Sequence, residues 1–89
     1  METTTGTTVT VRYFAAARAA AQTEAESIEL PAGAAIADAL SAVGERHGAE
    51  LARVLQRCSY LLDEVAVRDH AVRLHDGATL DVLPPFAGG

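Results

Sequence analysis

Two short segments in which apolar and polar residues alternate precede the first helical pattern of the sequence, and this order limits the folds open to the chain. Apolar side chains occupy every second position within residues 8–14, which is typical of a half-buried strand. Residues 27–30 alternate again and stop at Pro31, which predicts a second strand that pairs with the first. We expect the alanine-rich stretch between them, residues 15–21, to form a turn or a short helical piece.

A helix and further strands follow. Ile36, Leu40, Val43 and His47 recur at helical spacing, and Gly48 supplies a stop. The later apolar pattern predicts a second short helix at residues 51–57, two strands at 60–62 and 65–67 around Asp63-Glu64, a turn at Asp76-Gly77, and a last strand at 79–83 that Pro84-Pro85 ends.

A chain of 89 residues has room for one domain. The order strand, strand, helix and then two or three strands fits an α+β architecture in which a mixed sheet packs on one main helix. The β-grasp, or ubiquitin-like, fold is the natural candidate. We therefore predict a disordered leader at residues 1–8, a β-grasp domain at 9–83 and a flexible, projecting tail at 84–89 that ends in Gly-Gly.

Charge and composition exclude several classes of function. The net charge is −5, and the seven basic residues, all arginine, form no cluster, so we expect no nucleic-acid partner. No apolar stretch approaches the length of a membrane span, and no signal peptide follows Met1. We therefore expect a cytoplasmic protein with no membrane partner. The chain is also small for a complete catalytic cleft, which favours a carrier or binding module.

Few residues show the pattern of a catalytic or metal site. Phosphate-binding glycine loops and the nucleophile-elbow motif are absent from the sequence. His47, His70 and His75 lack partners at metal-ligand spacing, so we expect no metal and predict that they are solvated or lie at helix ends. Cys58 is interpreted as a small buried residue rather than a nucleophile, and acids such as Glu45 as a solvated helix face.

The carboxyl-terminal tail combines stiffness, reach and two residues without side chains. Pro84 and Pro85 direct the chain away from the last strand. The segment that they begin extends up to about 20 Å, at roughly 3.3 Å per residue. Gly88 and Gly89 lack Cβ atoms and fit a slot too narrow for other residues. The tail is therefore predicted to present an unhindered Gly89 carboxylate to the active site of another protein.

Side-chain alternation predicts an apolar surface at the root of the tail. With Tyr13 and Val82 facing the core, Phe14 and Leu83 fall on the outer face, and Phe86 follows just beyond. An exposed apolar cluster beside a projecting tail is typical of a docking surface. A β-bulge in either strand would instead bury one of these side chains.

Four segments carry a resemblance to a known family: residues 11–18 (VRYFAAAR), 30–34 (LPAGA), 76–77 (DG) and 84–89 (PPFAGG). They resemble the small subunit of molybdopterin synthase, MoaD, of the MoaD/ThiS family of ubiquitin-like sulfur carriers. The similarity runs from about Val9 to Gly89. The Pro-Pro-x-x-Gly-Gly ending looks more like the molybdopterin branch than like the thiazole carrier ThiS, which is usually shorter and lacks the paired prolines.

The resemblance implies a route for sulfur. A MoeB-like activating enzyme adenylates Gly89 with Mg-ATP, and sulfur from a donor protein replaces the adenylate to give a thiocarboxylate. The carrier docks on the large subunit, MoaE, in a heterotetramer of two carriers and two large subunits. There the sulfur passes to cyclic pyranopterin monophosphate. The chain itself would bind no cofactor and act as the non-catalytic, sulfur-donor subunit.

The same resemblance assigns roles by position. Gly89 bears the sulfur, and Gly88 keeps the partner's channel clear. Partner contacts are expected from Phe14, Arg18, Leu83, Pro84, Pro85 and Phe86. Two departures leave local geometry open: Asp63-Glu64 stands where the family often has Asn-Gly, and the helix start at Ala34-Ala35 lacks a Ser or Thr cap.

Three other functions remain open at this point. The sulfur acceptor can be a thiazole precursor, a cysteine precursor or a tRNA. Alternatively, the chain is a ubiquitin-like modifier joined through Gly89 to lysines of other proteins. The last alternative is a plain β-grasp interaction module in which the Gly-Gly ending is incidental.

Overall fold

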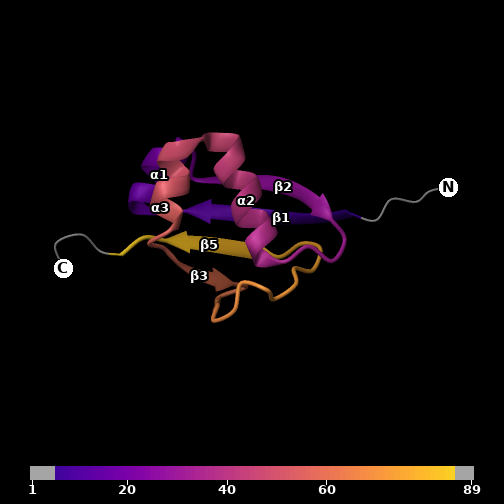
Figure 1. The fold of residues 1–89 in the computed structure, drawn as a ribbon. Coiled ribbons are helices and arrows are strands. Elements are labelled where there is room, and N and C mark those ends of the chain that lie inside the picture. Colours follow the sequence, from indigo (N-terminus) through magenta and orange to yellow (C-terminus); the bar gives the residue numbers. More distant parts are fainter. Residues whose placement is uncertain (1–5, 86–89) are drawn as a thin grey trace.

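The computed structural model describes residues 6–85. Within them, five strands form one mixed sheet, and three helices are packed against it (Figure 1). The strand order is β2-β1-β5-β3-β4. In chain order the elements are β1 (Gly6–Tyr13), α1 (Ala15–Ala21), β2 (Ala25–Pro31), α2 (Ile36–His47), α3 (Ala49–Leu55), β3 (Ser59–Leu62), β4 (Val65–Ala66) and β5 (Thr79–Leu83). This is the predicted α+β, β-grasp arrangement.

The central pair of strands joins the beginning of the chain to its end. Strand β1 pairs antiparallel with β2 and parallel with β5, so that Tyr13 lies opposite Val82. Strand β5 also pairs antiparallel with β3, with Ser59 opposite Leu83. The carboxyl ends of β1 and β5 therefore meet at one end of the sheet, which is where the tail leaves the domain (Figure 1).

The core lies between the sheet and the helices, as the apolar periodicity predicts. Alternate residues of β1 and β5 are fully buried, and the apolar stripes of α2 and α3 pack onto them. The largest fully buried side chains are Tyr13, Ile36, Leu51, Leu80, Val9, Val11, Val43 and Val82. Burial of this apolar face is the main stabilising contribution.

The beginning of the domain differs from the prediction. Strand β1 starts at Gly6, so a leader of residues 1–8 is too long, and residues 6–8 belong to the strand. The reason is that Thr7 pairs with Leu30 and is buried, although its side chain is polar. Residues 1–5 lie outside the described residues. The alanine-rich stretch forms the helix α1, and α2 is the longest of the three helices, as expected for the main helix.

The two departures from the family pattern are accommodated locally. Asp63 and Glu64 form the two-residue loop between β3 and β4 with φ values of 48° and 73°, so both adopt the left-handed conformation that Asn-Gly favours. At the start of α2, the Asp38 carboxylate accepts a hydrogen bond from the Ala35 N–H (2.8 Å). Asp38 thus supplies part of the capping that Ala35 cannot supply with its own side chain.

A half-buried polar cluster ties the end of α2 to the sheet. Glu26 of β2 accepts hydrogen bonds at Oε2 from the Tyr13 hydroxyl (2.5 Å) and at Oε1 from Arg46 (2.9 Å). His47 Nε2 also lies 2.5 Å from Glu26 Oε2. His47 is the last residue of α2. The helix-end position predicted for this histidine is confirmed, and its side chain is 16% exposed.

Candidate functional site

The root of the tail brings together residues from both ends of the chain. The Phe14 N–H donates to the Val82 carbonyl (3.2 Å), which continues the β1–β5 ladder by one residue and sets Phe14 beside Leu83 along the strand ends. Pro84 and Pro85 follow directly and cannot donate to a ladder. We call Phe14, Leu83, Pro84 and Pro85 the tail-root surface.

The exposure of these residues agrees with the alternation seen in the sequence. Phe14 is 39% exposed, which is high for a phenylalanine, and Pro85 is exposed. Leu83 and Pro84 are half-buried, whereas Leu80 and Val82 are completely buried. The predicted outward position of Phe14 is confirmed, and no bulge interrupts the β1–β5 register.

An ion pair on the outer face of the sheet supports Phe14. Arg12 and Asp81 lie opposite each other in the parallel β1–β5 pair. The guanidinium donates from Nε to Asp81 Oδ1 (2.6 Å) and from Nη2 to Oδ2 (2.9 Å). These hydrogen bonds raise the pKa of Arg12. Asp81 is buried beneath Arg12, which explains why an acidic residue on the outer face is only 5% exposed.

The same guanidinium continues toward the aromatic ring. Its Cζ lies 5.8 Å from the centroid of the Phe14 ring, within the range of a cation–π interaction. Asp81, Arg12 and Phe14 therefore form a row that holds the ring at the surface. Sequence reasoning missed this row, because the pairing of Arg12 with Asp81 depends on the parallel register of β1 and β5.

Arg18 lies one helical turn beyond Phe14. Its N–H donates to the Phe14 carbonyl (3.4 Å), and its side chain approaches Glu24 at 3.6 Å, with both side chains largely exposed. An exposed pair of this length contributes little to stability, so the guanidinium remains free to exchange partners. Ala15, between Phe14 and the body of α1, has a φ of 52°, so a strained residue makes the turn from strand to helix.

The sequence model of the ThiS family matches residues 11–89. This chain belongs to the ThiS family. No curated protein matches it.

Solved structures agree with this family assignment. Subunit 1 of a molybdopterin converting factor from Pyrococcus furiosus is 26% identical, with a TM-score of 0.76 over 90% of this chain and 99% of that chain. A complex of subunits 1 and 2 of the Helicobacter pylori factor contains a chain that is 26% identical, with a TM-score of 0.64 over 92% of this chain and 99% of that one. SAMP1 from Haloferax volcanii has the same fold at 22% identity, with a TM-score of 0.82 over 92% and 99% of the two chains. The ThiS-family chain thus has the fold of the ThiS/MoaD-like sulfur carriers.

Several predicted site residues of this ThiS-family chain lie outside the described residues. They are Phe86, Gly88 and Gly89, so their roles stay predictions. Within residues 6–85, no group of three or more His, Cys, Asp or Glu residues is placed to hold a metal ion. In the same part of the chain, no helix is long and apolar enough to cross a membrane.

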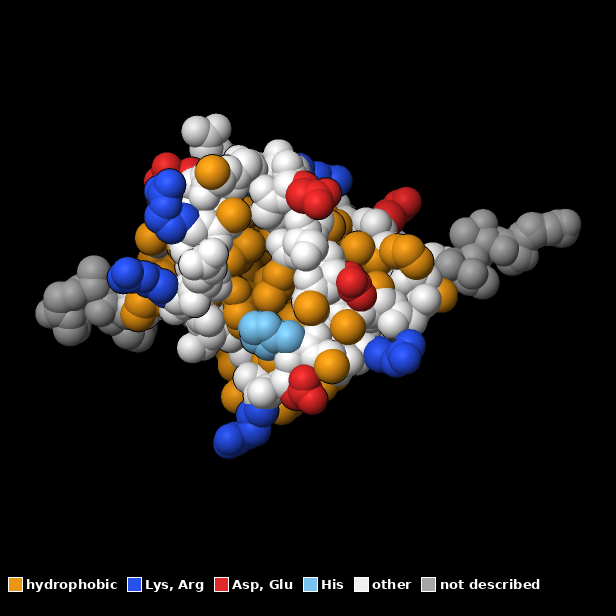
Figure 2. All heavy atoms as spheres, in the orientation of Figure 1, with side chains coloured by type: hydrophobic (Ala, Val, Ile, Leu, Met, Phe, Trp, Pro, Cys, Tyr) orange, Lys and Arg blue, Asp and Glu red, His pale blue; other side chains and the backbone are white. Residues whose placement is uncertain are grey.

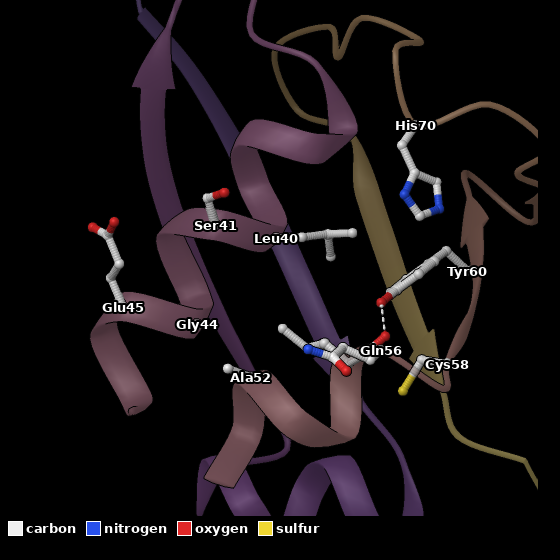
Figure 3. A pocket seen from close by; sticks show the side chains of 10 residues that line it. Leu40, Ser41, Gly44, Glu45, Ala52, Gln56, Cys58, Tyr60 and His70 are labelled. Carbon is white, nitrogen blue, oxygen red and sulfur yellow. Dashed lines mark hydrogen bonds between the residues drawn. The ribbon is translucent and has the colours of Figure 1, made fainter. Parts of the chain in front are cut away.

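Cys58 lies in a groove of about 500 Å³ between α2, α3 and β3 (Figure 3). Its thiol donates to the Val54 carbonyl (3.2 Å), and burial raises its pKa. His70 packs edge-on against Tyr60, and among the described residues no hydrogen bond joins it to Cys58 (Figure 3). A raised thiol pKa and the absence of a base contact among the described residues do not favour a nucleophile. Cys58 is half-buried, however, and not fully buried as predicted.

Proposed function

We propose that this protein is a sulfur carrier for molybdenum cofactor biosynthesis, in which the carboxylate of Gly89 becomes a thiocarboxylate. The observation that carries the proposal is the tail-root surface. The strand that leads to the Gly-Gly ending lies in the centre of the sheet and leaves it beside an exposed Phe14. A partner can therefore hold the domain and receive the tail at the same time.

The chemistry needs an activated carboxyl group, because a free carboxylate is a poor acyl donor. Attack of a Gly89 oxygen on the α-phosphate of Mg-ATP, in a MoeB-like enzyme, gives the acyl adenylate and pyrophosphate. A hydrosulfide equivalent from a donor protein then displaces AMP and leaves the thiocarboxylate. Gly88 and Gly89 suit both steps because neither residue has a side chain to obstruct a narrow active site.

We assign the docking contacts to the tail-root surface and to Arg18. Phe14 offers an aromatic ring already held in place by Arg12, so that little side-chain entropy is lost on binding. The proposed partner is the large subunit of molybdopterin synthase, in a heterotetramer with two copies of each chain. The Helicobacter pylori relative, solved as a complex of subunits 1 and 2 of its factor, supports a partner of this kind.

Transfer to cyclic pyranopterin monophosphate is the finer part of the proposal. The two molybdopterin-factor relatives at 26% identity favour it over a thiazole, cysteine or tRNA acceptor. A role as a protein modifier is the second candidate, since structures titled small archaeal modifier protein 1 share the fold. Because the sequence contains no lysine, copies of this protein cannot be joined to one another by isopeptide bonds to lysine side chains.

The test is an intact mass measured after incubation with a MoeB-like enzyme, Mg-ATP and a sulfur donor. We expect the mass to rise by the difference between one sulfur and one oxygen, and fragmentation to place the change at Gly89. A variant that lacks Gly89 is the matched control and should stay unmodified with the same unfolding midpoint. An unchanged mass, with an activating enzyme shown to modify its own cognate carrier, would refute the carrier function.

A second stage separates the acceptors. The thiocarboxylated protein is mixed with a molybdopterin synthase large subunit and cyclic pyranopterin monophosphate, and the formation of the dithiolene is measured. Sulfur loss without dithiolene formation, or adducts of cell proteins that resist reduction, would move the function to another acceptor or to a modifier.

A further inference from the structure

The edge of the sheet at β2 carries backbone groups without a partner in residues 6–85. The Tyr13 N–H donates to the Glu24 carbonyl (2.8 Å), so residues at even positions of β2 face β1 in the antiparallel ladder. Ser27 and Glu29 therefore turn their N–H and carbonyl groups outward. No hydrogen bond from another described residue reaches these groups. Such an edge is a template for one more strand.

A groove runs beside this edge, between β2 and α2. Its volume is about 430 Å³. Leu30 of β2 and Ala42 of α2 contribute apolar lining, and Asp38, Ser41 and Glu45 of α2 lie along it. Because Leu30 faces the helices, a strand added to β2 would direct every second side chain toward this groove.

The surroundings of the groove are acidic. Asp38 and Glu45 line the groove and are exposed, and the space-filling view shows acidic side chains over α2 (Figure 2). Glu29 lies on the opposite face of the sheet, since its neighbours Ile28 and Leu30 face the helices. Of the nearby arginines, Arg46 pairs with Glu26, whereas Arg73 donates to the neutral Gly33 carbonyl (3.2 Å) and keeps its positive charge at that end of the groove. Asp38 and Glu45 together outweigh this charge, so the groove favours positively charged groups near α2.

A second copy of the chain fits this edge poorly. Residues 24–31 contain Glu24, Glu26 and Glu29 and no basic residue. Antiparallel pairing of two β2 strands would therefore bring two acidic segments together, and like charges across a strand pair are destabilising.

We propose that the β2 edge binds an extended, basic segment of a partner protein by strand addition. The segment hydrogen-bonds to the outward groups of Ser27 and Glu29. The side chains that it directs toward the groove are one apolar residue between two Lys or Arg residues, which lie near Asp38 and Glu45. The groove is reached from the Pro31 end of β2, whereas the tail leaves from the opposite end of the sheet, since β1 and β2 are antiparallel (Figure 1). Binding here leaves the tail-root surface free.

The experiment is a titration of the full chain, labelled with ¹⁵N, with the peptide Lys-Thr-Val-Thr-Lys-Thr, in which the Lys and Val side chains share one face of the strand. We expect the amide signals of residues 25–31 and of α2 to shift, and amides 27 and 29 to gain protection from hydrogen exchange. Three control peptides are compared: Glu-Thr-Val-Thr-Glu-Thr, a peptide in which Ser replaces the Val, and a copy of the first peptide in which proline replaces the central Thr. We expect each control to bind at least about tenfold more weakly.

Variants of the protein test the same contacts. Ser27→Pro removes an outward N–H at an edge position that tolerates proline, and Ser27→Ala keeps it. Ser41→Arg puts a positive charge beside the groove without touching the β2 backbone. We expect Ser27→Pro and Ser41→Arg each to weaken binding by about tenfold or more, and Ser27→Ala to leave it unchanged.

Two further variants each remove one negative charge, one at the groove and one away from it. Glu45→Gln should weaken binding, whereas Glu50→Gln, on α3 away from the groove, should not. Unfolding midpoints show which variants keep the fold, and Ser41→Arg carries the test if Ser27→Pro unfolds. Shifts that map to the tail-root surface, or equal binding of the basic peptide and its proline copy, would overturn the proposal. Neither result depends on whether Gly89 carries sulfur.

Discussion

Removal of one hydroxyl group, in Tyr13→Phe, tests the polar cluster that ties α2 to the sheet. Tyr13 is 2% exposed, and its hydroxyl donates to the Glu26 carboxylate at 2.5 Å. Burial alone raises the pKa of Glu26, but hydrogen bonds from Tyr13, His47 and Arg46 outweigh burial and hold it below its ordinary value. The substitution removes one of these bonds and keeps the aromatic ring in place.

The magnitude follows from the charge of the acceptor. A hydrogen bond to an ionised group contributes about 2 kcal/mol, and His47 and Arg46 still contact Glu26, so no buried charge is left without a partner. Tyr60→Phe is the matched control. Tyr60 is 4% exposed, and its hydroxyl donates to the neutral Leu55 carbonyl (2.7 Å), a bond that contributes about 1 kcal/mol. The melting temperature should fall by about 8–16 °C in Tyr13→Phe and by about 4–8 °C in Tyr60→Phe.

The pH dependence gives a second readout. Since the pKa of Glu26 is lower in the folded protein than in the unfolded chain, its contribution is present above the unfolded value of about 4.3. It is lost as the pH falls through the folded value. The difference between wild type and Tyr13→Phe should therefore shrink below about pH 4, whereas the Tyr60→Phe difference should not. Urea unfolding at pH 7 and pH 3.5 measures both. The reasoning would be refuted if the two variants lost the same free energy of unfolding at pH 7. It would also be refuted if the loss in Tyr13→Phe were the same at pH 7 and pH 3.5.

Three further predictions concern the loops and the tail-root surface. Glu64→Gly should stabilise the protein by up to about 1 kcal/mol in urea unfolding, because Glu64 has a φ of 73° and glycine adopts this conformation without strain; a loss of stability would contradict this account of the loop. His75 Nε2 lies 2.6 Å from the Asp63 carboxylate, which raises the pKa of His75, so Asp63→Asn should lower that pKa in an NMR titration. The stabilising effect of this raised pKa is complete below the unfolded histidine value of about 6.5 and is lost as the pH rises through the folded value, so Asp63→Asn should cost more stability at pH 6 than at pH 9. Phe14→Asp should weaken binding to the large subunit by at least about tenfold in calorimetry, with a nearly unchanged melting temperature, because Phe14 is 39% exposed. Leu83→Asp should weaken binding and also lower the melting temperature, because Leu83 is half-buried. A collapse of the fold in Phe14→Asp would place this ring in the core.

Periodicity accounts for most of what the sequence predicts about the fold. Apolar alternation locates β1, β2 and β5, although β1 and β2 each begin two residues earlier than predicted. The stripe from Ile36 to His47 coincides with α2, because these elements bury one continuous face. The start of β1 was misplaced, since Thr7 is polar yet pairs with Leu30 in the sheet. A polar residue at the end of a strand can be buried because it pairs with a neighbouring strand, and its hydropathy alone does not predict this burial.

The candidate site was predictable where one strand determines the outcome and not where two strands must combine. The outward position of Phe14 follows from counting along β1 alone. The Arg12–Asp81 pair depends on the parallel register between residues 69 positions apart. The helix-end position of His47 was predictable from its place in α2, but its contact with Glu26 of β2 was not. Contacts between distant segments need the topology before they can be assigned.

The position of β5 also determines when the domain can fold during synthesis. This strand is the last to be made, yet it joins the β1–β2 hairpin to the β3–β4 hairpin. Until Leu83 has left the ribosome, the nascent chain consists of two separate hairpins and helices whose apolar faces have no complete sheet to cover. Pairing of β1 with β5 is a contact of high sequence separation, which is formed late and slowly. The sheet is therefore completed only when β5 inserts between β1 and β3, after the other described strands and helices have been made.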